Sequence, residues 1–128
     1  MNGTRKNKNK NRKKNKMNKY EDLEKLVLDW SSERGIISNG KAVSQLLKTI
    51  SELGELADAF AKGDHDEVKD AVGDTLVCLI NFCALSNISM MDCLAGAYDT
   101  IKDRKGYLNA EGIFIKDVPT DNCCGPWD

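Results

Sequence analysis

The sequence has no apolar run long enough to cross a membrane and none of the spacings that mark a zinc site. Its longest apolar stretch, residues 75–85, is interrupted by Asn81, whereas a membrane-spanning helix needs about 18 to 20 apolar residues. The chain also begins without the apolar segment of a signal peptide. Its single histidine, His65, and the absence of any Cys-x-x-Cys pair exclude the usual zinc motifs. We therefore expect no membrane contact and no zinc.

The five cysteines lack the pattern of a disulfide framework. Cys78, Cys83 and Cys93 fall within apolar helical patterns, where a free cysteine behaves as a small apolar residue. Cys123 and Cys124 are adjacent in a polar tail. Because an odd count without a signal segment favours a reducing compartment, we expect a cytoplasmic protein whose three helical cysteines lie in the core.

The net charge of −1 hides an uneven distribution of charge along the chain. Residues 1–19 contain nine of the 19 Lys and Arg residues, whereas all 20 Asp and Glu residues lie in residues 20–128. A run built from Asn and Lys has too little apolar surface to fold, so we predict a disordered basic extension over residues 1–19. It is either a solvated extension or a weak, salt-sensitive contact with nucleic acid through counterion release.

Residues 20–116 show the apolar periodicity of an all-α domain with four helices. We predict these helices at about 20–33, 42–61, 64–85 and 89–105. The third and fourth begin with capping boxes, Asp64-x-x-Glu67 and Ser89-x-x-Asp92. Residues 107–116 alternate weakly and predict a short hairpin or extended arm, and residues 117–128 predict a loose tail.

The second predicted helix has an apolar stripe that runs from Val43 to Phe60, and the third helix is apolar on most sides after Asp74. A helix that is apolar nearly all round needs cover on several sides, which four helices of one small chain supply poorly. We therefore expect a homodimer or homotetramer that completes the four-helix bundle.

Four carboxylates form two pairs on the second and third helices. Glu52 and Glu55 are three residues apart, and Asp70 and Asp74 are four apart, so each pair shares a helix face. The short link 62–64 turns the chain back, and both pairs then lie roughly 9–16 Å from the turn, level with each other. Carboxylates facing one another repel unless a cation lies between them, and hard oxygen ligands suit Mg²⁺ or Mn²⁺. The pattern predicts a metal site, and such a site suggests phosphate chemistry.

The segments Ser51-Glu-Leu-Gly-Glu55 and Gly73-Asp-Thr-Leu76 match parts of a known pattern, Glu-Glu-x-x-Glu on one helix followed by an acidic pair on the next. With the flanking segments they make residues 30–116 resemble the MazG-like nucleotide pyrophosphohydrolases of the all-α NTP pyrophosphatase superfamily. The chain departs from the pattern at Ser51, where the family has Glu, and at Ala71, where many relatives have Glu. Asp70 lies on the required face, and Glu67-x-x-Asp70 also has the required spacing, so either alternative can complete the acidic set.

The resemblance implies a Mg²⁺-dependent enzyme that cleaves a nucleoside triphosphate between its α and β phosphates, with Mn²⁺ as a second candidate cofactor. It implies that the catalytic residues are Glu52, Glu55 and Asp74, and that Asp70 joins them as a metal ligand. A cation held there would lower the pKa of a bound water for attack. The expected substrate-binding residues carry cationic, amide or aromatic groups suited to phosphate, sugar and base: Lys48, Asn81, Trp30, Lys102, Arg104 and Lys105.

Several of these residues also have a purely structural interpretation. Trp30 suits a core better than a base contact, Asn81 is equally suited to a buried polar pair between helices, and residues 102–105 suit the C-terminal dipole of a helix. Capping alone explains Glu67. Two functional alternatives remain as well: a non-catalytic helical oligomer with a basic arm that binds nucleic acid, and a pyrophosphatase specific for dUTP.

Overall fold

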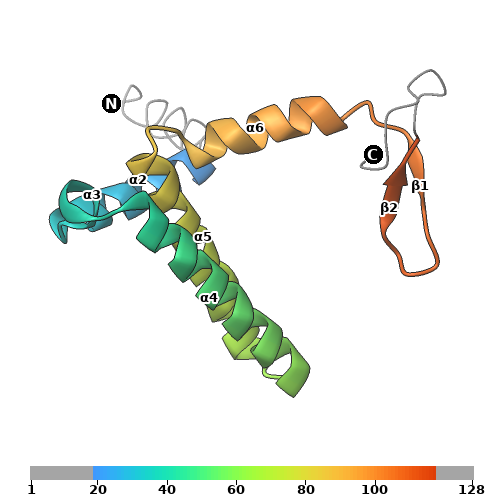
Figure 1. The fold of residues 1–128 in the computed structure, drawn as a ribbon, viewed down its shortest axis with the longest axis horizontal. Coiled ribbons are helices and arrows are strands. Elements are labelled where there is room, and N and C mark those ends of the chain that lie inside the picture. The colour runs from blue at the N-terminus through green and yellow to red at the C-terminus, as the bar shows by residue number, and fades with distance from the viewer. Residues whose placement is uncertain (1–18, 118–128) are drawn as a thin grey trace, which may run out of the picture. The chain divides into compact units, whose positions relative to one another are not determined.

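The computed structural model describes residues 19–117, so the predicted tail beyond residue 117 and nearly all of the predicted basic extension lie outside the described residues. The predicted all-α class is confirmed (Figure 1). The chain divides into two units, Met1–Cys93 and Leu94–Asp128, which are described separately. The elements in chain order are α2 (Lys19–Glu33), α3 (Ile36–Asn39), α4 (Ala42–Lys62), α5 (His65–Leu85), α6 (Met90–Ile101), β1 (Gly106–Leu108) and β2 (Phe114–Lys116).

Helices α4 and α5 form an antiparallel hairpin and lie side by side along their length (Figure 1). The turn between them depends on Gly63, which adopts the left-handed conformation with φ of 73° that glycine tolerates without steric cost. The Gly63 and Asp64 amides donate to the Phe60 and Ala59 carbonyls at 3.1 and 3.0 Å, which closes the end of α4. The predicted antiparallel arrangement of these two helices is therefore confirmed.

In each of the two predicted capping boxes, the side chain of the first residue accepts its expected hydrogen bond, but the reciprocal bond from the fourth residue's side chain does not form. The Asp64 carboxylate accepts a hydrogen bond from the Glu67 amide at 3.1 Å, but the Asp64 amide donates to Ala59, so it is not left for the Glu67 side chain. At the second box, the Ser89 hydroxyl accepts from the Asp92 amide at 3.3 Å. Glu24 of α2, rather than Asp92, completes this cap by accepting from the Ser89 hydroxyl and from a main-chain amide of the first turn of α6.

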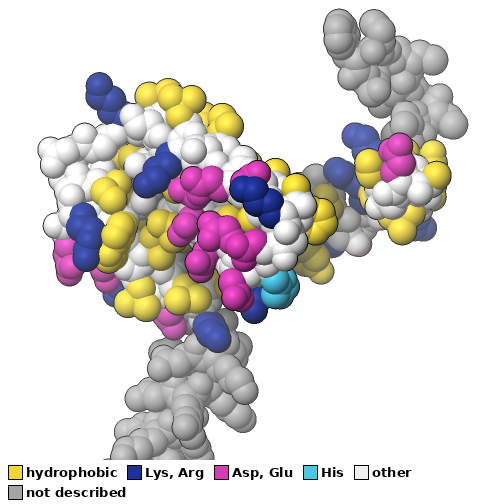
Figure 2. All heavy atoms as spheres, turned by 90° about the horizontal axis from the view of Figure 1, so that it is seen from below, with side chains coloured by type: hydrophobic (Ala, Val, Ile, Leu, Met, Phe, Trp, Pro, Cys, Tyr) yellow, Lys and Arg dark blue, Asp and Glu magenta, His cyan; other side chains and the backbone are white. Residues whose placement is uncertain are grey.

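Apart from Ile80, the buried residues of the first unit have small or polar side chains. Its buried residues are Ala59, Ala71, Cys78, Ile80, Cys83, Ser31, Thr49, Thr75 and Asn81. The apolar stripe of α4 stays 42% to 78% exposed: Val43, Leu46, Leu47, Ile50, Leu53 and Phe60. Figure 2 shows apolar side chains on the surface around a group of acidic ones. One chain therefore leaves the stripe uncovered, and the homodimer or homotetramer stays a prediction.

Two of the three helical cysteines are buried as predicted, Cys78 and Cys83. The third prediction was wrong, because Cys93 is exposed. Its place in the first turns of α6 explains the difference, since no residue of that helix is classed as buried. An apolar pattern identified the helix but not the extent of its cover.

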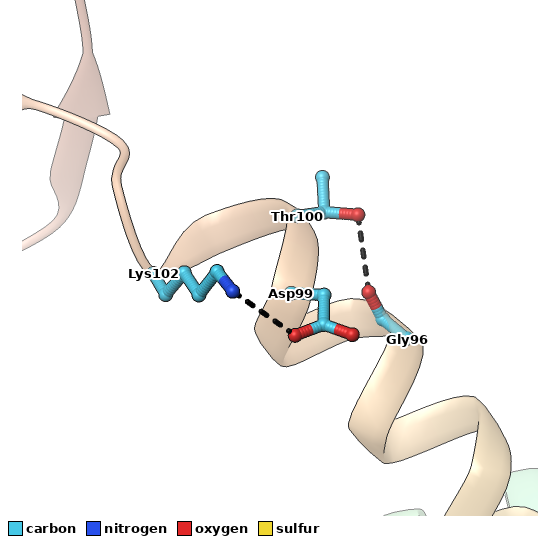
Figure 3. Close-up of polar contacts among 4 residues, drawn as sticks. All are labelled: Gly96, Asp99, Thr100 and Lys102. Carbon is cyan, nitrogen blue, oxygen red and sulfur yellow. Dashed lines mark hydrogen bonds and ion pairs between the residues drawn. The ribbon is translucent and has the colours of Figure 1, made fainter.

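The second unit contains most of α6 and a two-stranded hairpin. Helix α6 ends at Ile101, four residues earlier than predicted, and the chain then turns through Lys102 and Asp103. Figure 3 shows the last turn, where the Lys102 ammonium lies 3.4 Å from the Asp99 carboxylate and the Thr100 hydroxyl donates to the Gly96 carbonyl. Strands β1 and β2 then pair antiparallel, which confirms the predicted hairpin.

Within residues 19–117 no single helix has both the length and the apolar content needed to cross a membrane. Helices α5 and α6 meet these two criteria only when they are counted together as a bent pair.

The cap of α5 predicts a measurable contribution to stability. Asp64→Ala removes the acceptor of the Glu67 amide and should lower the free energy of unfolding by about 1 kcal/mol, measured by denaturant titration. Asp64→Asn keeps an oxygen acceptor and should stay close to the parent. Equal losses in both variants would show that the charge of Asp64, rather than the cap, stabilises the helix.

Candidate functional site

Three carboxylates come together where α4 faces α5, and we call them the acidic cluster: Glu52, Glu55 and Asp74. The pKa of Glu52 lies above its ordinary value, first because Glu52 shares a hydrogen bond with Glu55 and next because it is partly desolvated. The negative charges of Glu55 and Asp74 raise this pKa further, and the positive charge of Lys48 opposes them. The effect of Asp74 on the pKa of Glu52 therefore shows that the acids of α4 and α5 lie near one another.

One oxygen of the acidic cluster has no partner. Glu52 Oε2 is buried, and none of the residues in the described part of the chain donates a hydrogen bond to it. A buried, unpaired carboxylate oxygen is costly, so native proteins usually satisfy it with a donor, a proton or a cation. Since the neighbouring groups are carboxylates, whose oxygens are the ligands that Mg²⁺ and Mn²⁺ prefer, the residues fit a divalent cation.

The register between α4 and α5 extends from this cluster. Glu52 is level with Asp74, and one turn farther from the Gly63 turn Lys48 is level with Cys78. The pKa of the Cys78 thiol is raised mainly by burial, and the charges of Lys48, Glu52 and Asp74 all act on it, which supports this pairing. Lys48 therefore lies next to the acidic cluster, as its predicted phosphate-binding role requires.

The predicted metal ligands are not assembled into a finished site. Asp70 does not appear among the groups that shift the pKa of Glu52. Across residues 19–117, no three His, Cys, Asp or Glu side chains are arranged to hold a metal ion as they stand. The ligand set of Glu52, Glu55, Asp70 and Asp74 consequently stays a prediction, as do the catalytic roles of Glu52, Glu55 and Asp74.

Trp30 is neither a core residue nor an unoccupied aromatic platform. Its side chain is 45% exposed, and the Arg34 guanidinium lies 4.4 Å from the ring centroid, within the range of a cation–π contact. Arg34 Nη1 also approaches the Trp30 carbonyl at 3.3 Å. Sequence reasoning missed Arg34, although its position four residues after Trp30, directly beyond the end of α2, was the signal for this contact.

Asn81 is a buried polar residue paired between helices, as its structural interpretation predicted. It is 3% exposed, and its Oδ1 accepts a hydrogen bond from the Ser31 hydroxyl at 2.6 Å. Ser31 of α2 is itself fully buried at 0% exposure. No local pattern marked Ser31, because its partner is 50 residues away in the sequence. A contact between Asn81 and substrate stays a prediction.

The three basic residues predicted to bind phosphate near the end of α6 belong to the second unit: Lys102, Arg104 and Lys105. Lys102 pairs with Asp99 (Figure 3), and both side chains are substantially exposed. An exposed ion pair of this kind contributes little to stability, so its replacement by a phosphate contact would cost little. The phosphate-binding roles of the three residues stay predictions.

Comparison with models of known protein families shows which family this chain belongs to. The model of the MazG nucleotide pyrophosphohydrolase domain matches residues 42–108. The chain belongs to the MazG nucleotide pyrophosphohydrolase family. The matched region begins with α4 and ends with β1, so it contains the whole acidic cluster, and the predicted family is confirmed.

A curated relative of this MazG-family chain is the uncharacterized 18.2 kDa protein in the rep-hol intergenic region of Haemophilus phage HP1 (strain HP1c1). The two are 31% identical over 62 residues, which cover 46% of this chain and 38% of the relative. The chain thus spans well under half the length of the curated relative that it matches. No solved structure matches the chain significantly.

The raised pKa of Glu52 predicts how the stability of the metal-free protein depends on pH. Because folding raises this pKa above its unfolded value of 4.5, the folded state holds the proton more tightly, and the contribution of Glu52 to stability declines as pH rises above about 4.5. Glu52→Gln should therefore match the parent in thermal stability at pH 4 and exceed it at pH 7. Equal melting temperatures at pH 7 would show that Glu52 is not destabilised by its neighbours.

Proposed function

We propose that this MazG-family chain is a divalent-cation-dependent nucleoside triphosphate pyrophosphohydrolase, which cleaves between the α and β phosphates to release a nucleoside monophosphate and pyrophosphate. Family membership supports the reaction class. The observation that carries the proposal for this chain is the unpaired, buried oxygen of Glu52 between the charges of Glu55 and Asp74. A bound cation would satisfy this oxygen and reduce the repulsion among the carboxylates. The same cation can bind the phosphate oxygens of a triphosphate, which an acidic surface would otherwise repel.

Glu52, Glu55 and Asp74 would hold Mg²⁺, or Mn²⁺ in its place, with Asp70 as a fourth ligand from the same face of α5. When bound, such a cation neutralises phosphate charge and lowers the pKa of a bound water. Glu55, Asp70 and Asp74 are exposed, so their side chains can rotate toward Glu52, which is half-buried. Because the pKa of Glu52 is raised, binding of a cation would favour the deprotonated form of this carboxyl group.

The basic and aromatic side chains supply the remaining contacts with the nucleotide. Lys48 is exposed and one helical turn from Glu52, so its ammonium can donate charge-assisted hydrogen bonds to phosphate oxygens without opposing the acids. Lys102, Arg104 and Lys105 are further phosphate-binding candidates from the second unit. Trp30 offers a base the face of its ring that Arg34 leaves uncovered.

The exposed stripe of α4 supports a homodimer or homotetramer as the working form. Six apolar side chains between 42% and 78% exposed on one helix are more than a small soluble monomer ordinarily leaves uncovered. Association through this helix would also bury part of the surroundings of the acidic cluster, which strengthens electrostatic interactions there.

The function is tested by a pyrophosphate-release screen over the ribo- and deoxyribonucleoside triphosphates, dUTP included, with Mg²⁺, Mn²⁺ or a chelator. We expect release of pyrophosphate and the matching monophosphate in equal amounts, dependent on the cation. Release of inorganic phosphate instead would place the cleavage elsewhere. Turnover of dUTP alone would favour the dUTP-specific alternative, and no turnover of any nucleotide would favour the non-catalytic oligomer.

Asp74→Asn is expected to lower the rate of hydrolysis by about 100-fold or more. Loss of a group that only supports a metal ligand already costs up to about 100-fold, and Asp74 is proposed as a ligand itself. The substitution keeps the shape of the side chain but removes one negative charge beside Glu52. Mg²⁺ affinity, measured by calorimetry, should fall with it. The melting temperature of the metal-free protein should stay equal or rise, because repulsion within the acidic cluster is relieved.

The matched control is Glu67→Gln, which changes an exposed acid of α5 whose main-chain amide, rather than its carboxylate, makes the capping contact. This variant should keep most of the activity. An active Asp74→Asn variant beside an inactive Glu67→Gln variant would contradict the assignment and move the metal to Glu67 and Asp70.

A further inference from the structure

The Ser31–Asn81 pair joins α2 to α5 inside the first unit. Both residues are nearly inaccessible, at 0% and 3% exposure, and the 2.6 Å distance from the Ser31 hydroxyl to Asn81 Oδ1 is that of a short hydrogen bond. The pair therefore fixes the Asn81 side chain from one side.

The contact occupies only half of the hydrogen-bonding capacity of the carboxamide. With Oδ1 bonded to Ser31, the remaining group is Nδ2, a donor of two hydrogen bonds. No described residue accepts a hydrogen bond from Nδ2. Asn81 is 3% exposed, and Nδ2 is the part of its side chain that the Ser31 contact leaves available to a ligand.

Asn81 lies at a suitable distance from the acidic cluster to meet the nucleoside end of a substrate. It follows Asp74 by seven residues, which is two helical turns along the same face of α5, or about 10 Å. A triphosphate bound at the acidic cluster extends its sugar and base over a distance of this order. Trp30, the sequence neighbour of Ser31, is half-exposed in the same unit.

We propose that Ser31 is a positioning residue for nucleoside recognition, whose hydroxyl holds the Asn81 carboxamide so that Nδ2 donates to an acceptor atom of the sugar or base. The proposal rests on the proposed function. Asn81 would then have two roles: its Oδ1 accepts the structural hydrogen bond from Ser31, and its Nδ2 donates to the ligand. Loss of the Ser31 hydroxyl leaves the carboxamide able to turn, so that an acceptor replaces the donor at the ligand.

The experiment compares Ser31→Ala and Asn81→Asp with the parent full-length protein in steady-state hydrolysis of the best nucleotide from the screen. Each variant should raise KM by about 3- to 10-fold, the worth of one hydrogen bond, with kcat within about twofold. Inhibition by inorganic tripolyphosphate, which has phosphates but no nucleoside, should be unchanged. Comparison of ribose with deoxyribose substrates tells a sugar acceptor from a base acceptor, since only a 2′-hydroxyl contact is lost with the deoxy form.

Thr49→Val is the matched control. Thr49 is also buried, at 5% exposure, and its hydroxyl donates within its own helix to the Gln45 carbonyl at 2.8 Å. Its loss should lower stability in the same way as that of Ser31 and leave KM unchanged. An equal rise of KM in Thr49→Val, or weaker tripolyphosphate inhibition in Ser31→Ala, would overturn the proposal in favour of general loosening of the fold.

A second measurement needs neither variant to turn over substrate. The side-chain amide signals of Asn81, assigned by their absence from Asn81→Asp, should shift when a nucleoside monophosphate is added to the parent protein. Unchanged signals at saturating monophosphate would overturn the role of Asn81 even if hydrolysis is observed. If the parent hydrolyses no nucleotide in the screen, the proposed function fails separately, and this titration still decides whether Asn81 contacts a nucleoside.

Discussion

Repulsion among carboxylates that face one another across the α4–α5 hairpin is the constraint on which the rest of the site depends. Glu52 meets this constraint with a raised pKa, a hydrogen bond shared with Glu55, and a lysine one turn away. One of its oxygens nevertheless stays buried and unpaired. A fold selected for stability alone would replace such a group, so its presence is best understood through the cation and the triphosphate that it can bind.

The small core makes this close approach of carboxylates sterically feasible. The buried residues of these two helices include Ala59 of α4 and Ala71, Thr75 and Cys78 of α5, and such short side chains let two helices approach closely. The same choice of residues leaves the large apolar side chains of α4 facing outward. The placement of small side chains inside and large apolar side chains outside therefore explains both the close approach of the acids and the apolar surface that a partner subunit would cover.

Helical periodicity predicted α2, α4 and α5 nearly to the residue, because strong apolar repeats bounded by glycine and capping residues act locally. The acids of the cluster were predicted for the same reason, since spacing on a helix fixes the face. The sequence could not show which face would be covered: Cys93 and the α4 stripe are apolar yet exposed. Ser31 and the Glu24 cap of α6 were missed because each depends on a partner at least 50 residues away.

The central claim, that Glu52, Glu55 and Asp74 bind one divalent cation between α4 and α5, is tested most directly by titrating the ¹⁵N-labelled protein with Mn²⁺. The unpaired electrons of Mn²⁺ broaden the amide signals of nearby residues first. We predict that the signals of α4 around Glu52 and of α5 around Asp74 broaden together at the lowest Mn²⁺ concentrations, and that excess Mg²⁺ restores them. Broadening centred on Glu67, or spread evenly over the exposed acids of the chain, would contradict the account.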